Sequence, residues 1–190
     1  MHNLNGVDVL GLHYLNGRPE NYKLDQQFWK YTYSTSADRI IQTLVDNDFI
    51  SLKPNVRQSL SNLTVAQLKE ILRENDLKVS GNKPDLIERV IEELPHEKLE
   101  EKLKKIWTPT DKGKKLVEET DFIKFAHNKI NHLVSINDIY RLYLENLSLD
   151  SKDILIKAIE NKIKFRGNIE NYVNIPYALL ELSRVCNEYR

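Results

Sequence analysis

The sequence predicts a mainly α-helical protein, and three observations carry this prediction. The 190 residues are 41% hydrophobic and 29% charged, with only six glycines and six prolines, which is the composition of a folded chain. Apolar residues recur at helical spacing in several segments, whereas only two short segments read as strands. A helical hairpin lies between those two segments in chain order, and a helical region follows from about residue 128.

Charge and cysteine content exclude several classes of protein. Lys and Arg number 28, as do Asp and Glu, so no overall field attracts polyanions. The single cysteine, Cys186, can form neither an internal disulfide nor a cysteine-based zinc site, which favours a reducing compartment. The start lacks a signal-peptide pattern, and no apolar run approaches the roughly 18 residues of a membrane span. We therefore expect a cytoplasmic protein with no membrane partner and no metal or cofactor.

The N-terminal part contains one clear amphipathic helix. From Ala37 the apolar positions keep helical spacing, Ser36 is a suitable N-cap, and polar residues at 46–48 end the helix. We expect strands over 49–52 and 106–110. A thin helical stripe is also predicted at Leu99, Leu103 and Ile106, and its last residue is also the first of the second predicted strand.

Residues 63–94 give the most informative pattern. Thr64 and Gln67 form a capping box for a first helix, which carries an apolar stripe and ends near residues 75–76. After a tight connection, Asn82 can cap a second helix, and Pro84 fits its first turn. The buried face of this second helix is predicted to comprise Leu86, Ile87, Val90, Ile91 and Leu94.

The C-terminal third reads as three helices. Ser135 and Asp138 form a capping-box pair for the first, which runs to about residue 146. The second spans about 151–165, and the third begins near Pro176.

The hairpin resembles a known family, the SAP domain, a helix-extended-loop-helix module associated with binding DNA. Fourteen positions at fixed spacing over 27 residues carry this resemblance. They are Leu63, Thr64, Val65, Leu68, Lys69, Leu72, Leu77, Val79, Ser80, Gly81, Lys83, Leu86, Ile87 and Arg89. The resemblance implies a SAP domain at about 61–95 that holds DNA phosphates.

The residues themselves support the same mode of binding. The turn at 80–82 leads into a helix N-terminus, where free backbone N–H groups and the helix dipole favour a phosphate, and Lys83 lies beside it. The predicted nucleic-acid-binding residues are Lys69, Arg73, Lys78, Ser80, Gly81, Asn82, Lys83 and Arg89. An alternative is that residues 80–82 are only a turn and a helix cap.

The hairpin's own charge leaves a second function open. Between residues 61 and 95 there are five basic and seven acidic side chains. A protein-interaction adaptor, in which the hairpin is structural, is therefore the alternative to DNA binding.

The flanks resemble a winged-helix domain more weakly. An amphipathic helix after Ser36, two short strands and a helix after Thr110 match its recognition helix, wing and closing helix. This resemblance implies three parts: a discontinuous winged-helix-like region at 1–57 and 96–127, the SAP domain at 58–95, and a C-terminal helical region at 128–190.

Enzyme signatures are lacking in the sequence. There is no phosphate-binding loop, dinucleotide fingerprint or serine elbow, and His127 and His132 lie five apart, off a common helix face. We predict a non-catalytic protein that binds duplex DNA weakly, in a salt-sensitive way and with little sequence specificity. Residues 128–190 would bind a protein partner or a second copy. The frequent Lys, Asn and Ile suggest AT-rich coding, and hence a low-GC bacterium or its phage, with the protein associated with the nucleoid.

Overall fold

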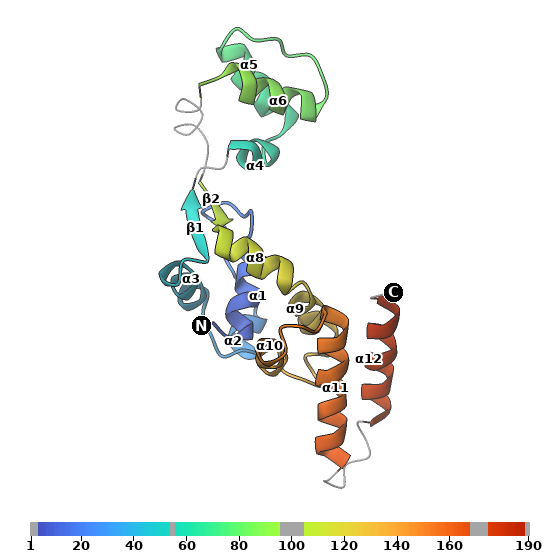
Figure 1. Ribbon diagram of the computed structural model, residues 1–190. Coiled ribbons are helices and arrows are strands. Elements are labelled where there is room, and N and C mark those ends of the chain that lie inside the picture. Colours follow the sequence, from blue (N-terminus) through green and yellow to red (C-terminus); the bar gives the residue numbers. More distant parts are fainter. Residues whose placement is uncertain (1–3, 54–55, 96–104, 168–174, 189–190) are drawn as a thin grey trace. The chain divides into compact units, whose positions relative to one another are not determined.

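A computed structural model describes residues 4–53, 56–95, 105–167 and 175–188, and within them the chain is mostly helical (Figure 1). The elements before the sheet's first strand are α1 (Gly6–Leu15), α2 (Phe28–Tyr31) and α3 (Ala37–Asp46). Strand β1 (Ile50–Lys53) precedes α4 (Val56–Ser61), α5 (Val65–Glu74) and α6 (Lys83–Glu93), and β2 (Ile106–Pro109) follows them. The remaining elements are α8 (Asp111–Glu119), α9 (Phe122–Phe125), η1 (Ala126–Ile130), α10 (Ile136–Glu145), α11 (Ser151–Gly167) and α12 (Ile175–Glu188).

The chain divides into two compact units, and each is discontinuous in sequence. Unit 1 comprises residues 1–14, 24–49 and 111–190, and unit 2 comprises residues 15–23 and 50–110. Unit 2 therefore contains both strands and the helices between them. The three-part organisation with winged-helix-like flanks stays a prediction.

The two strands pair as predicted and enclose the hairpin in chain order. They are antiparallel, with Ile50 opposite Pro109 and Lys53 opposite Ile106. The loop that follows α1 also pairs with β2, because Gly17 N donates a hydrogen bond to Trp107 O over 2.9 Å. Ile106 begins this strand and is not part of a helix, which corrects one member of the predicted stripe; Leu99 and Leu103 lie outside the described residues.

Four predicted helix starts are confirmed by their caps. The side chains of Ser36, Thr64, Asn82 and Ser135 each accept a hydrogen bond from the backbone N–H three residues later. Thr64 and Asn82 form full capping boxes with Gln67 and Asp85. Local sequence is sufficient here because each contact joins residues three apart.

Helix α1 was not predicted, and its burial explains why. Val7, Val9, Leu10 and Leu12 are buried around it, so it has no polar face and no amphipathic period. Its one acidic residue, Asp8, is fully buried and accepts a hydrogen bond from Arg39 of α3. Burial raises the pKa of the Asp8 carboxyl, and Arg39 partly offsets this effect.

The aromatic segment before α3 contains the short helix α2. Trp29 of α2 is buried, and the ring of Phe28 lies 4.3 Å from that of His127. Nδ1 of His127 is 2.6 Å from the Tyr33 hydroxyl, so this histidine packs among aromatic side chains of unit 1. Cys186 is half-buried on α12.

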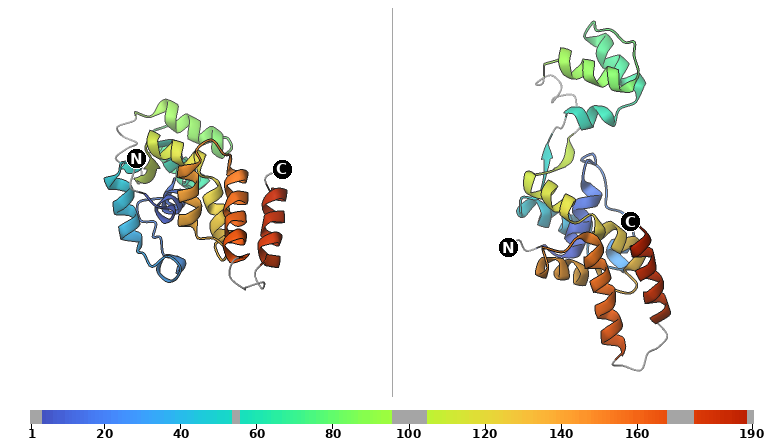
Figure 2. Two further views of the ribbon diagram at one scale, coloured as in Figure 1. Left: turned by 60° about the horizontal axis from the view of Figure 1, so that its bottom comes forward. Right: turned by 45° about the vertical axis from the view of Figure 1, so that its right-hand side comes forward.

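The C-terminal helices complete unit 1. Figures 1 and 2 show α11 and α12 side by side, and α10 packs on α11. Val185 on α12 is buried, while Leu179 and Leu180 are 54% and 48% exposed. Among the described helices, none combines the length and apolarity needed to cross a membrane.

Candidate nucleic-acid interface

The hairpin in unit 2 is built from three helices around one small core. The core consists of Leu60, Leu68, Leu72, Leu86, Ile87 and Val90. The stripes predicted on the two longer helices supply all of these residues except Leu60, which comes from α4. A domain this small buries little apolar surface, so one additional leucine is a substantial fraction of its core.

Helix α4 is the part of the hairpin that sequence reasoning missed. Its six residues are too few to show a clear helical period. Val56 and Leu60 of the helix and Leu63 just after it do follow the i, i+4, i+7 spacing. Arg57 of α4 also pairs with Glu88 of α6 through two N–H···O contacts. The hydrogen bond from Arg57 lowers the pKa of the Glu88 carboxyl.

The loop between α5 and α6 presents the predicted phosphate site. Gly81 has φ +127°, a conformation that residues with a Cβ rarely adopt. A Cβ at this position would lie 3.0 Å from both Cβ and Oδ2 of Asp85. Asp85 itself accepts from Asn82 N, so Gly81 leaves room for the capping box at the start of α6.

Lys83 is placed where α6 begins, as predicted. Its Nζ donates to the carbonyl oxygen of Ser61, at the end of α4, over 2.7 Å. This contact places a cation against the partly negative end of a helix. Because an ammonium group has three N–H donors, the Ser61 bond uses only one of them.

Arg89 has a defined contact of a different kind. Its Nη1 donates to the carbonyl oxygens of Lys78, over 2.7 Å, and Ser80, over 2.8 Å. These bonds tie the middle of α6 to the loop before it. Arg89 is half-buried, whereas Lys78 and Ser80 are exposed.

The remaining predicted cations lie on α5. Lys69 and Arg73 are four residues apart, so they share one side of the helix, and Arg73 is exposed. Glu70 and Glu74 repeat this spacing one residue later, on the neighbouring side. The structure thus joins Lys78, Ser80 and Arg89 through hydrogen bonds, and places Lys83 and the α5 cations on separate elements.

Residues 59–95 match the SAP domain family. The match covers the hairpin together with the last turn of α4, so its first residue falls between the two predicted starts, residues 58 and 61. The SAP domain lies between β1 and β2 in chain order, within an otherwise mostly helical protein. No curated protein and no solved structure matches the chain.

The SAP domain offers hydrogen-bond donors and cations but no metal-binding cluster. Throughout the described part of the chain, no three His, Cys, Asp or Glu side chains gather in a way that could hold a metal ion. At the loop, the groups that can donate hydrogen bonds are the Ser80 and Asn82 side chains, the Lys83 ammonium group and the Lys83 backbone N–H, because the capping box already uses the N–H groups of Asn82 and Asp85. These groups suit an anion such as a phosphate.

Proposed function

We propose that this protein is a non-catalytic DNA-binding protein whose SAP domain contacts the phosphate backbone of duplex DNA with little sequence specificity. The SAP match is consistent with DNA binding as a general function. The observation that carries the finer proposal is the turn at residues 80–82, which leads into the N-terminus of α6 beside Lys83.

The site is suited to phosphates rather than to base edges. Helix α6 has 11 residues, so its N-terminus carries a full helix dipole. Phosphate contacts position a protein on DNA without reading its sequence. Since the proposed contacts are to phosphates, the expected binding is weak and tolerant of sequence.

The second candidate is a protein-interaction adaptor, and charge favours it. Residues 59–95 carry five basic and seven acidic side chains. Lys83 and Arg89 each donate to backbone carbonyls, so part of their role is to hold the SAP fold. In the DNA-binding proposal as well, the C-terminal region, residues 128–190, would bind a protein partner or a second copy.

Titration with short duplexes of two unrelated sequences, at several salt concentrations, tests the proposal. With about three or four phosphates neutralised, log affinity should fall against log salt with a slope of about −3 to −4. Both duplexes should bind alike. Salt-independent binding, or none at low salt, would overturn the phosphate-contact proposal.

A pair of lysine variants localises the contact. Lys83→Ala should weaken binding and reduce the magnitude of the slope by about one, as expected when one phosphate contact is lost. Lys114→Ala is the matched control, because Lys114 lies on α8 and pairs with Asp111 over 3.0 Å. Equal losses from both variants would indicate a diffuse electrostatic attraction instead, and no loss from either would favour the adaptor.

A further inference from the structure

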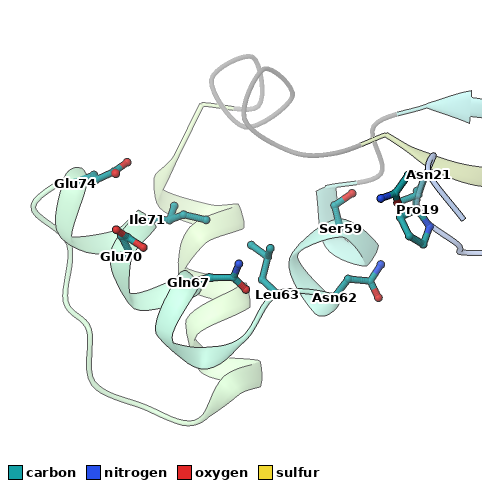
Figure 3. A pocket seen from close by; sticks show the side chains of 10 residues that line it. Pro19, Asn21, Ser59, Asn62, Leu63, Gln67, Glu70, Ile71 and Glu74 are labelled. Carbon is teal, nitrogen blue, oxygen red and sulfur yellow. The ribbon is translucent and has the colours of Figure 1, made fainter.

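A groove on the SAP domain has the opposite charge from its predicted phosphate site. A cavity of about 660 Å³ lies within unit 2; its hairpin wall is formed by α5 and the end of α4, and Pro19, Asn21 and Ile106 line it as well. Figure 3 shows Glu70 and Glu74 one helical turn apart on α5, with Ile71 beside them.

Two aliphatic side chains of the hairpin line this groove. Leu63 and Ile71 line the cavity and are only partly buried, although both pack against the SAP core. Gln67 adds an amide to the same wall. An aliphatic side chain entering the groove would therefore contact apolar carbon on a surface already fixed by the core.

The rim determines which ligand can enter. Glu70 and Glu74 are exposed and line the cavity, so they repel phosphate and attract cations. Successive helical residues are about 100° apart, and Lys69 and Arg73 consequently lie on the adjacent side of α5. Helix α5 thus carries an acidic stripe on one side and a basic stripe on the adjacent side.

We propose that this acidic groove docks a cationic, aliphatic segment of a partner protein. Leu63 and Ile71 contact the aliphatic side chains of the segment, and the Glu70 and Glu74 carboxylates pair with its lysines or arginines. Charge complementarity selects this partner over nucleic acid. The proposal goes beyond DNA association, because it gives the SAP domain a second, protein-binding side.

Binding of a short labelled peptide of lysine and leucine to the full chain tests the groove by fluorescence anisotropy. The double variant Glu70→Gln with Glu74→Gln should bind about fivefold more weakly at low salt, since each exposed ion pair contributes modestly. The matched control is Glu92→Gln with Glu93→Gln on α6, which removes the same charge from exposed positions and should leave affinity unchanged. Equal losses from the two double variants would overturn the proposal.

A second peptide separates docking from general charge attraction. A lysine and serine peptide of equal charge should bind more weakly than the leucine peptide, because it cannot cover Leu63 and Ile71. Equal affinities for the two peptides, or no binding of either, would refute the proposal that the groove docks such a segment.

Two further measurements distinguish the other outcomes. DNA affinity of the Glu70→Gln, Glu74→Gln variant should be no lower than that of the parent, so failure of the groove and failure of DNA binding can be told apart. The parent should elute at the same position in gel filtration as this variant. Self-association that disappears in the variant would identify a second copy as the occupant and overturn the proposal.

Discussion

Nη1 of Arg89 lies 2.8 Å from the carbonyl oxygen of Ser80, so a side chain in the middle of α6 holds the loop that precedes the helix. The same nitrogen donates to Lys78 O. A predicted phosphate-binding residue therefore has a structural contact in the free protein. This geometry favours a positioning role for Arg89, in which it orders the loop proposed to contact the phosphate.

Replacing Arg89 distinguishes a positioning role from direct contact with a phosphate. Arg89→Ala should lower the free energy of unfolding of the SAP domain by about 1 kcal/mol, the usual net contribution of such hydrogen bonds. DNA affinity should fall while the salt slope keeps its magnitude, because no phosphate contact is lost. Arg89→Lys, which keeps a charged donor, should recover part of both losses. A slope reduced by about one in Arg89→Ala would show direct phosphate contact instead.

Gly81 is the backbone position most sensitive to substitution in the SAP loop. Gly81→Ala should destabilise the domain by about 1–3 kcal/mol, because the added Cβ meets Asp85 and the residue must adopt a strained φ. Denaturant unfolding measures this cost. Ser80→Ala, at the exposed neighbouring position, is the control and should stay within about 0.5 kcal/mol of the parent. Equal stabilities of the two variants would contradict the observed Gly81 geometry.

Unit 1 should lose stability in mild acid because of His13. Its ring is 8% exposed and Nε2 lies 3.0 Å from the Thr120 hydroxyl, and burial followed by the Lys124 charge lowers its pKa to about 4. Between this value and the unfolded value of 6.5 the unfolded chain binds more protons, so stability falls as the pH drops through that window. By pH 5 the loss should reach about 2 kcal/mol at most.

His13→Gln isolates this effect, since an amide can keep a bond to Thr120 without titrating. Urea unfolding between pH 7 and pH 5 should show a smaller loss for the variant than for the parent. Asp8 and His127, whose pKa values burial raises and lowers respectively, remain in both proteins and cancel in the comparison. His132→Gln, at an exposed site, should leave the parent profile unchanged. Parallel profiles for His13→Gln and the parent would exclude His13 as the cause.

Because β1 and β2 pair directly, we expect the rest of the chain to fold without the SAP domain. Lys53 and Ile106 are opposite each other, so joining them through Asn-Gly would close a two-residue hairpin. Circular dichroism should show that this shortened chain stays helical and melts cooperatively, because loop-closure entropy changes slowly with loop length. Residues 56–95 expressed alone should also be helical, and substituting Leu60→Ala should unfold them. Loss of structure in the shortened chain would show that the rest of the chain needs the SAP domain in order to fold.

The sequence by itself determined the local elements of this protein. The caps at Ser36, Thr64, Asn82 and Ser135 were predicted because each depends on residues three apart, and the hairpin's stripes follow the helical period. The SAP resemblance rested on the same short spacing, which is why it could be read before the structure. Chain order also predicted that the hairpin lies between two strands.

Contacts between distant residues were decided only by the tertiary structure. Helix α1 escaped prediction because it is buried on all sides, and α4 because its single buried leucine completes a core made by other helices. The bond from Lys83 to Ser61 spans 22 residues, and that from Arg57 to Glu88 spans 31. No periodic pattern encodes such pairs, since long side chains find their partners only after packing has brought the helices together. The charged residues of the hairpin could therefore be counted from the sequence, but their contacts within the hairpin, on which the proposed phosphate site and the proposed acidic groove rest, required the fold.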